Sequence, residues 1–380
     1  MLSPKALLPT SDAWKAGLRF AVAGGLAYAV AEYFELAEGF WAVVTAIILI
    51  QQPRIGGTVQ ASVDRVIGTI AGAVVGFIIA SLTPSTTLGT AVALTLSVGV
   101  LGVLSSRVQS FRVAPITAAI VILSPSSHAV AWISALHRVI EIMVGCVIGL
   151  AVSLLVAPTR SDSSMREESS HALALLARLI SLALDKQEGK PADAEIAKLS
   201  KELDTSFRDI AKIGKEVHEE EASHFSRTGL DPICLRLGLL DLQTAVFVLL
   251  SLARKPWPDS IRDVMAGPTR AVADAICDYM LALGSSLTAA QPSPPKDEMN
   301  TAFVAFSSSA AAGVETWHTA RDSAQLSKSS KDALADPPAL DGTAPSYISN
   351  VSFALEQLRY ALDKLAECTD GTSTGANRTQ

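Results

Sequence analysis

The sequence predicts an all-α protein in two parts: an integral membrane domain of six transmembrane helices, then a cytoplasmic helical bundle. Charge separates the parts, since residues 1–158 hold 8 Lys/Arg and 6 Asp/Glu while the rest of the chain holds 23 and 31. The first part has too few polar residues to cover its apolar surface in water, so we expect lipid around it. The net charge of -6 comes from the second part, and nothing is basic enough to bind nucleic acid.

Six apolar runs separated by turn residues are the candidate spans: 18–36, 40–50, 63–82, 88–104, 113–123 and 131–156. A helix needs about 20 residues to cross the hydrocarbon core. The runs 40–50 and 113–123, rising about 1.5 Å per residue, reach only about halfway. We expect both to extend through the polar residues beside them.

The two short runs are related in sequence, because residues 45–53 align without a gap on residues 117–125. After one inserted residue the match resumes, with Arg65 over Arg138, Gly72 over Gly145 and Gly76 over Gly149. This indicates an internal duplication, with repeats at about 14–82 and 88–157. Each repeat carries three spans, an odd number, so we expect a 3+3 inverted repeat. The glycines form stripes that close helix packing explains.

Loop charges predict the orientation. Positive residues precede span one and lie between spans two and three and between spans four and five: Lys5, Lys15, Arg19, Arg54, Arg65, Arg107 and Arg112. The alternate loops carry no Lys or Arg, and the first of them holds Glu32, Glu35 and Glu38. Both termini are therefore expected in the cytoplasm, with Trp14, Trp41 and Trp132 at span ends. An N-terminal signal peptide is the alternative, but the repeat requires this segment as a helix.

The second part begins near Thr159, where residues 159–162 supply helix N-cap candidates. Apolar residues at helical spacing predict the domain 159–368, with helices at 163–186, 192–221, 230–254, 266–287, 300–326 and 347–367. The run 235–252 is long enough for a seventh span, but Arg236 and Asp241 within it favour a core helix. The tail 369–380 lacks periodicity and is predicted to be disordered.

The chain offers little for catalysis. Cys146, Cys234, Cys277 and Cys368 lie far apart without metal spacing, which predicts isolated reduced thiols. His218 and His224 are six residues apart, so a solvated charged face is favoured over a metal site. Neither a phosphate-binding loop nor a nucleophile constellation is evident. We expect no enzyme activity, no cofactor and no metal.

Ionisable residues within the predicted spans are the candidate functional groups. Asp64 and Arg65 begin span three, and their repeat counterparts His137 and Arg138 lie in span six, one turn before Glu141. One interpretation is a structural ion pair with snorkelling arginines. The other is an anion pathway in which Arg65 and Arg138 attract a carboxylate, with Glu141, His137 or Asp64 as proton-coupling groups.

The short spans indicate the same region. Pro53 and Pro125 end them and leave carbonyls unpaired, which is tolerated at membrane depth only beside a cavity or packed protein. The polar residues that would line such a cavity are Thr45, Gln51, Gln52, Thr117 and Ser124. The alternative is that these are ordinary turn residues in headgroup water.

The stretch 41–53, with Trp41 before the short span and a Gln-Pro pair after it, and the stretch 64–76, with Arg-Val-Ile-Gly-Thr and spaced glycines, resemble the fusaric-acid-resistance-like family of aromatic acid exporters. They are also similar to plant aluminium-activated malate transporters. The resemblance covers the membrane half and implies export of small organic, often aromatic, carboxylates across the bacterial inner membrane, with Arg65 as an anion contact. Larger family members carry two hydrophobic blocks and this chain carries one, which implies a homodimer and leaves open a periplasmic adaptor protein.

Three functions follow as hypotheses. The first is a proton-coupled exporter of organic anions. The second is a passive anion channel with the same arginines. The third is a non-transporting membrane anchor whose cytoplasmic helices recruit a partner, in which Arg65 and Arg138 matter only for folding.

Overall fold

A computed structural model of the chain describes residues 11–374, apart from 85, 124–127, 157–159, 189, 223–230, 255–256, 258 and 330–343. Every regular element within these ranges is a helix, which confirms the all-α prediction. The chain divides into two compact units. Unit 1 comprises Met1–Ser161 and Lys215–Ser226, and unit 2 comprises Asp162–Gly214 and Arg227–Gln380. Each unit is described separately.

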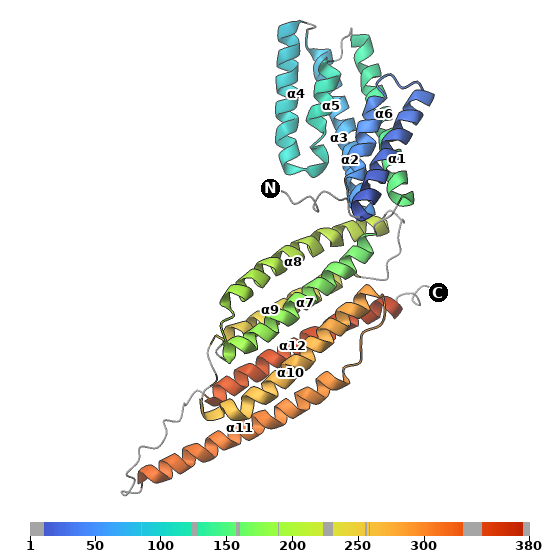
Figure 1. Cartoon of the computed structure of the whole chain (residues 1–380). Helices are drawn as coiled ribbons and strands as arrows, with labels where there is room; N and C mark the ends of the chain where they lie inside the picture. Colours follow the sequence, from blue (N-terminus) through green and yellow to red (C-terminus); the bar gives the residue numbers. More distant parts are fainter. Residues whose placement is uncertain are drawn as a thin grey trace, which may run out of the picture. The chain divides into compact units, whose positions relative to one another are not determined.

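Unit 1 is a bundle of long and short helices (Figure 1). They are α1 Ser11–Tyr33, α2 Phe40–Ile50, α3 Ile55–Leu82, α4 Thr87–Arg107, the 3-10 turn η2 Gln109–Phe111, α5 Ala114–Leu123 and α6 His128–Leu155. Helix α2 packs between α1 and α6, α3 packs against both α5 and α6, and α4 packs against α5. The short helices α2 and α5 therefore lie inside the bundle, each beside a long one.

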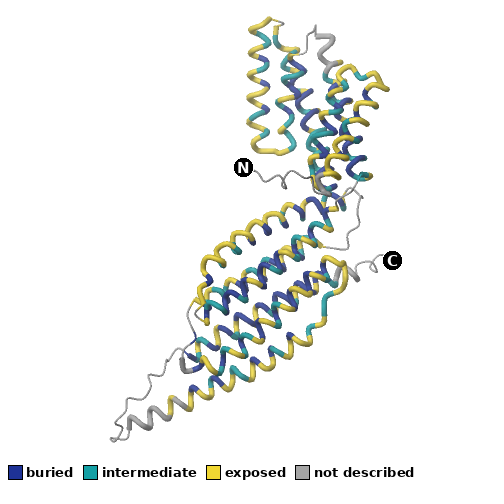
Figure 2. The backbone as a smooth tube through the Cα atoms, in the orientation of Figure 1, coloured by how far each residue is buried: buried dark blue, intermediate teal, exposed yellow. Residues whose placement is uncertain are grey.

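The helices of unit 1 have exposed faces (Figure 2), and many of the residues exposed there are large and apolar. Exposed apolar residues on α3 recur every three or four positions: Val63, Ile67, Ile70, Val74 and Ile78. Such a stripe suits lipid, because a soluble protein rarely exposes a continuous apolar face of this length. Among the described residues of this unit, three segments have the length and composition of membrane spans: Ile55–Leu82, Thr87–Arg107 and Ala135–Leu155. The chain is thus built as a multi-pass membrane protein.

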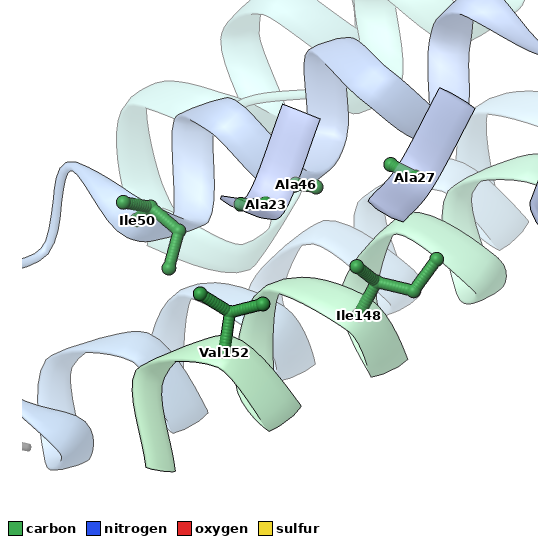
Figure 3. Packing of buried hydrophobic residues seen from close by; sticks show 6 residues of the cluster. All are labelled: Ala23, Ala27, Ala46, Ile50, Ile148 and Val152. Atoms are coloured by element: carbon green, nitrogen blue, oxygen red, sulfur yellow. The ribbon is translucent and has the colours of Figure 1, made fainter. Parts of the chain in front are cut away.

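Small side chains bring α1, α2 and α6 together. Ala23 and Ala27 of α1 and Ala46 of α2 are fully buried against Ile148 and Val152 of α6 (Figure 3). Alanine at these positions lets the backbones approach closely, which is how membrane helices gain packing energy without a strong hydrophobic driving force between them. This cluster holds α2 against the C-terminal half of α6. The sequence predicts that this half faces the cytoplasm.

Two glycines of α3 make room for α5. A Cβ added at Gly72 would lie 2.3 Å from the Ala114 carbonyl oxygen and 2.8 Å from the Thr117 Cβ. One added at Gly76 would lie 2.9 Å from the Ala118 Cα. Since real Cβ atoms do not approach backbone this closely, α3 and α5 can pack as they do only with glycine at these positions.

Two glycines of α6 make room for α2 in the same way. A Cβ added at Gly145 would lie 2.5 Å from the Ala42 carbonyl oxygen and 2.6 Å from the Thr45 Cβ, and one at Gly149 would lie 3.0 Å from the Leu49 Cβ. The α2 residues contacted by α6 are those that align, in the sequence repeat, with the α5 residues contacted by α3. The glycine helix of each predicted repeat therefore packs on the short helix of the other.

Unit 2 is built from long helices. They are α7 Ser161–Gln187, α8 Asp193–Ala222, α9 Pro232–Leu252, α10 Asp259–Thr288, α11 Asp297–Ser329 and α12 Ala344–Thr374, of which the end of α8 belongs to unit 1. Helix α10 begins seven residues earlier than the predicted 266, with Pro268 inside it, because Ile261 and Met265 are buried. Helix α9 also meets the length and composition of a membrane span. It packs against α12, and Asp241 of α9 pairs with Lys364 of α12 at 2.7 Å.

Helix α12 continues beyond the predicted end of the second domain, which corrects part of the predicted disordered tail. It reaches Thr374, whereas the tail was expected to begin at residue 369. Asp370 accepts hydrogen bonds from the Ser293 backbone N–H at 2.8 Å and the Ser293 hydroxyl at 2.5 Å. This tertiary contact stabilises the last turns, whose own sequence shows no apolar period. Residues 375–380 lie outside the described part of the chain.

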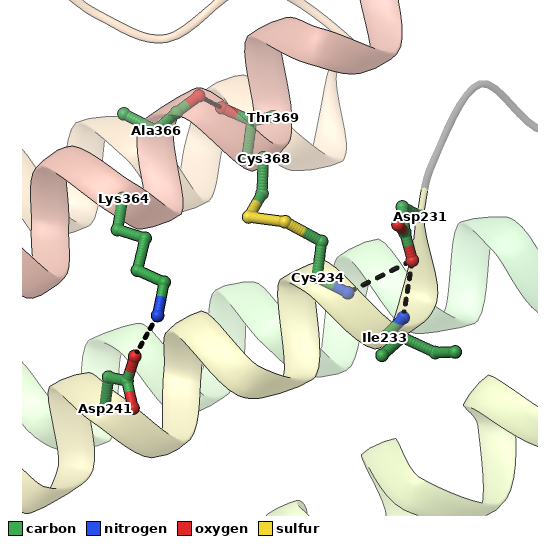
Figure 4. Close-up of a disulfide and its surroundings, with 8 residues drawn as sticks. All are labelled: Asp231, Ile233, Cys234, Asp241, Lys364, Ala366, Cys368 and Thr369. Atoms are coloured by element: carbon green, nitrogen blue, oxygen red, sulfur yellow. Dashed lines mark hydrogen bonds and ion pairs between the residues drawn. A yellow bond between two sulfur atoms is a disulfide. The ribbon is translucent and has the colours of Figure 1, made fainter.

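The prediction of four isolated thiols is wrong for Cys234 and Cys368, which form a disulfide between α9 and α12 (Figure 4). Their Cα atoms lie 5.8 Å apart, within the range that a disulfide bridges. The Asp231 side chain caps α9 by accepting from the Ile233 and Cys234 backbone N–H groups. The pairing depends on how two helices 134 residues apart pack, which cysteine spacing in sequence does not reveal. Cys146 and Cys277 are free thiols.

Candidate anion-binding site

A buried arginine lies at the centre of the candidate site. The Arg138 side chain is 3% exposed, and its guanidinium carbon lies 3.9 Å from the centroid of the Trp41 ring. Its Nη2 is 3.6 Å from Glu38 Oε2 and its Nη1 is 3.8 Å from Glu141 Oε2. Among the described residues, none of the three guanidinium nitrogens has a hydrogen-bond partner. The charge is thus balanced by nearby carboxylates and an aromatic face, while its N–H groups stay unpaired.

The turn between α1 and α2 reaches the middle of α6. The Glu38 backbone N–H donates to Glu141 Oε1 at 2.7 Å, and the Trp41 Nε1–H donates to Glu38 Oε2 at 3.2 Å. Glu141 is the fourteenth of the 28 residues of α6. If α6 spans the bilayer, this turn lies near mid-depth, where non-helical backbone is tolerated only against protein or a water-filled space. Glu38 itself is 46% exposed.

Arg65 of α3 contacts α2 one turn further along than Trp41 does. Its Nε–H donates to the Thr45 hydroxyl at 3.1 Å, and Thr45 is fully buried. Arg65 is close enough to Arg138 for their positive charges to interact. The structure therefore brings together the two arginines that the sequence repeat aligns, with Thr45 as a direct contact of one of them.

Asp64 takes part in a different contact. Its Oδ1 accepts from the Gln60 Nε2 at 3.1 Å and from the Ser110 hydroxyl of η2. Asp64 is the tenth residue of α3, so the α4–α5 connection reaches well along α3, about 15 Å from its start. In the same way, the α1–α2 connection of the first repeat reaches the middle of α6, where Glu38 contacts Glu141. Asp64 therefore anchors a connection, and no described contact joins it to Arg138.

The other sequence-predicted residues are dispersed. Gln52 lies in the turn before α3, where its Oε1 is 3.4 Å from the position of a Cβ at Gly57, and Gln51 is exposed beside it. Thr117 is buried against Gly72, and its hydroxyl donates to the Val113 carbonyl at 3.4 Å. Ser124 lies outside the described residues. His137 is exposed on α6, within electrostatic range of Glu141.

Sequence reasoning missed two members of the site, Glu38 and Trp41. The loop acids served only to orient the helices, and Trp41 was expected at the headgroup level. A signal was available, because Trp41 opens a short helix and Glu38 precedes it by three residues, so both can reach one point. No spacing rule connects them to Arg138, which follows about a hundred residues later.

A second buried cation also went unrecognised. Arg19 of α1, expected as a flanking loop charge, is 7% exposed and donates from Nη2 to the Ser153 hydroxyl at 3.1 Å. Ser153 and Thr58 of α3 are fully buried, and their hydroxyl oxygens lie 3.2 Å apart. These contacts link α1, α3 and α6 through hydroxyl groups, and none of the ion pairs among the described residues involves Arg19.

The end of α8 docks on the start of α3. Arg54 Nη1 donates to Glu216 Oε2 at 2.9 Å. Glu220 Oε1 accepts from the Gly56 backbone N–H at 2.9 Å and from the Ser161 backbone N–H at 3.0 Å. A single buried carboxylate therefore stabilises the N-termini of two helices, α3 and α7, where unpaired N–H groups and the helix dipole favour negative charge.

The Arg138 guanidinium has the chemistry to bind a carboxylate. No group of three or more His, Cys, Asp or Glu side chains within the described ranges has the arrangement of a metal site. A guanidinium presents parallel N–H groups that match a carboxylate in two places. With its N–H groups unpaired, Arg138 can accept such a ligand at low cost.

Comparison with known proteins adds one finding. The family model of the fusaric acid resistance protein family matches residues 13–334 of this chain, which includes all of the site. The sequence has no match among the curated proteins with which it was compared.

Proposed function

We propose, because this chain belongs to the fusaric acid resistance protein family, that it is a secondary transporter that exports small organic anions, aromatic carboxylates above all. Family membership and the apolar helices make it a multi-pass membrane protein of the transporter class. The observation that carries the specific proposal is the buried Arg138 guanidinium, whose three nitrogens lack hydrogen-bond partners among the described residues.

The proposed membrane architecture is six spans arranged as a 3+3 inverted repeat. Its support is the reciprocal packing of α3 on α5 and of α6 on α2 through aligned residues. Further support is the depth of the two connections, which reach Asp64 in α3 and Glu141 in α6. Inverted repeats characteristically place a substrate site near the bilayer midplane, where the two repeats meet. Arg65 and Arg138 lie at such a meeting point.

The proposed orientation keeps both termini in the cytoplasm of a bacterial inner membrane. Arg54, Arg107 and Arg112 then lie at the cytoplasmic ends of their helices. Unit 2, including α9, is proposed to be a cytoplasmic bundle, and the half-size chain is proposed to function as a homodimer. We expect chemical cross-linking in native membranes to capture the dimer.

Proton coupling is proposed to involve Glu141 and His137. Glu141 is 1% exposed and lies beside Arg138, so its charge influences how strongly the arginine attracts an anion. Neutralising a buried carboxylate next to a guanidinium leaves the cation free to bind an external carboxylate. Proton binding at Glu141 and anion binding at Arg138 would then be linked, so a pH gradient would affect anion transport.

The test is efflux of radiolabelled benzoate from proteoliposomes, with and without a pH gradient. We compare the native chain with Arg65→Gln, Arg138→Gln and the charge-keeping Arg138→Lys. Arg112→Gln serves as a matched control, because Arg112 is exposed in a connection. We expect gradient-driven efflux to fall at least about tenfold in both Gln variants, and less in Arg138→Lys, which keeps the charge but loses the forked N–H geometry.

Each outcome separates the hypotheses. Efflux that ignores the gradient yet needs both arginines would favour a passive anion channel. Equal flux in the native chain and in Arg138→Gln would contradict the site. An absence of flux for every carboxylate tested would favour a membrane anchor whose helical unit 2 binds a partner.

A further inference from the structure

We propose that Glu38 is an internal competitor of the transported anion: its carboxylate occupies the place on Arg138 that the carboxylate of an aromatic monoanion takes during transport. The inference rests on the proposed function and deepens it. It assigns a role to a residue in the α1–α2 turn and defines the substrate as a singly charged aromatic acid.

The first argument is the difference in burial between the two acids that face Arg138. The Glu141 side chain is 2% exposed, whereas the Glu38 side chain is 46% exposed. Glu141 is also tied down, because its Oε1 accepts the Glu38 backbone N–H. Among the described residues, the Glu38 side chain is held only through its Oε2, by Arg138 at 3.6 Å and by the Trp41 Nε1–H at 3.2 Å. Glu38 is therefore the partner that can swing into solvent.

The second argument is that both groups facing Glu38 Oε2 suit any carboxylate. When the Glu38 side chain leaves, the Arg138 Nη2 and the Trp41 Nε1–H become available together. An incoming carboxylate can accept from both with its own oxygens, so it replaces the lost contacts in kind. The site should therefore select a carboxylate, because the same two donors already face the Glu38 carboxylate.

The third argument is charge balance. Arg65 and Arg138 interact with each other as like charges, and Glu38 and Glu141 are the two acids in contact with Arg138. Exchange of the Glu38 carboxylate for one substrate carboxylate keeps two negative charges beside two positive ones. A dianion would add an uncompensated buried charge, which is costly. The site should therefore prefer monoanions.

The fourth argument concerns the rest of the substrate. Phe40 is 57% exposed, and its ring centroid lies 5.0 Å from that of Trp41. A ring attached to the bound carboxylate would lie near this exposed aromatic side chain, where stacked or edge-on contacts contribute favourably. An aliphatic acid of the same charge would lack this contact.

Loss of the Glu38 charge should assist the exchange, because a neutral side chain holds Arg138 less strongly than a carboxylate does. The charged and titratable groups around it are Arg138, Glu141 and His137 of α6, Arg65 of α3, and Glu32 and Glu35 of its own segment. Of these, Arg138 and Glu141 contact Glu38 directly.

The experiment is calorimetric titration of the purified full chain in detergent with benzoate and with benzenesulfonate. Benzenesulfonate carries one negative charge without a carboxyl group, so it tests whether the site binds an aromatic monoanion in general. The variants are Glu38→Gln, Glu38→Asp and Arg138→Gln. Glu35→Gln is the matched control, an exposed acid of the same turn whose substitution keeps the side-chain shape.

We expect Glu38→Gln to bind both anions about fivefold to tenfold more tightly than the native chain, with Glu35→Gln unchanged. Glu38→Asp, which keeps the negative charge, should bind both anions less tightly than Glu38→Gln does. Affinity of Glu38→Gln equal to that of Glu35→Gln, with binding still lost in Arg138→Gln, would overturn the Glu38 inference alone. Absence of binding in every folded variant would overturn the proposed function with it.

Discussion

Arg54 and Glu216 lie 162 positions apart in the chain, yet their side chains meet at 2.9 Å and join the end of α8 to the start of α3. Glu216 is 8% exposed and Arg54 18% exposed. The next turn of α8 adds the Glu220 hydrogen bond to the Gly56 backbone. The end of α8 follows the six predicted spans and α7 in the chain, yet it packs within unit 1 against α3, the helix that carries Arg65.

Removing one side of this ion pair should destabilise unit 1. We expect Glu216→Gln to cost about 1–3 kcal/mol, because it leaves a largely buried guanidinium with a weaker acceptor. Arg54→Gln combined with Glu216→Gln should cost less than the sum of the single changes. Thermal unfolding in detergent measures both. Glu219→Gln on the same helix is the control, and additive losses would show that the pair does not interact.

Alanine at the contact glycines should separate the helices. Gly72→Ala and Gly145→Ala each place a methyl group within 2.5 Å of a carbonyl oxygen, so we expect a loss of about 1–3 kcal/mol in each. Gly99→Ala and Gly102→Ala in α4 meet nothing within 4 Å and should be neutral or slightly stabilising. Equal melting temperatures for all four variants would contradict the described packing.

The helices themselves could be predicted from sequence, because long apolar or amphipathic periods set them locally. Four of the six helices of the second part begin and end within three residues of their predicted ranges, whereas α10 begins seven residues early and α12 ends seven residues late. Long-range partners could not be predicted in the same way. Glu38 meets Arg138, and Cys234 meets Cys368, only because separate helices pack together. The repeat was the one long-range signal, and it placed Arg65 and Arg138 at matching positions without showing which acids face them.

Opening the disulfide should weaken unit 2 more than any single exposed contact does. A loop of 134 residues is closed by Cys234 and Cys368, so its loss frees the unfolded chain and should cost about 2–5 kcal/mol. We expect Cys234→Ser with Cys368→Ser, or reductant alone, to lower the melting temperature. Adding reductant to the double variant should then have no further effect. Alkylation before and after reduction counts the two thiols released.

Cys277 should resist alkylation in the folded protein. Burial, reinforced by the negative charges of Asp274 and Asp278, raises its pKa to about 12. At pH 8 the thiolate fraction is then about a thousandfold lower than for an ordinary thiol with a pKa of about 8.5. Mass spectrometry of iodoacetamide-treated protein should find Cys277 modified at least about a hundredfold more slowly than in urea. Similar rates in both would contradict its burial against the Ala177 carbonyl.

The bridge between α9 and α12 also gives the sidedness of the chain a chemical marker. Cytosolic reductants keep thiols open, while the space outside the inner membrane oxidises them. If unit 2 faces the cytoplasm, Cys234 and Cys368 trapped by rapid alkylation in living cells will be free thiols, and the bond will close only once the cells are broken in air. If the Cys234–Cys368 disulfide is already present in living cells, unit 2 lies outside the cytoplasm. Every predicted span would then cross the membrane in the opposite direction.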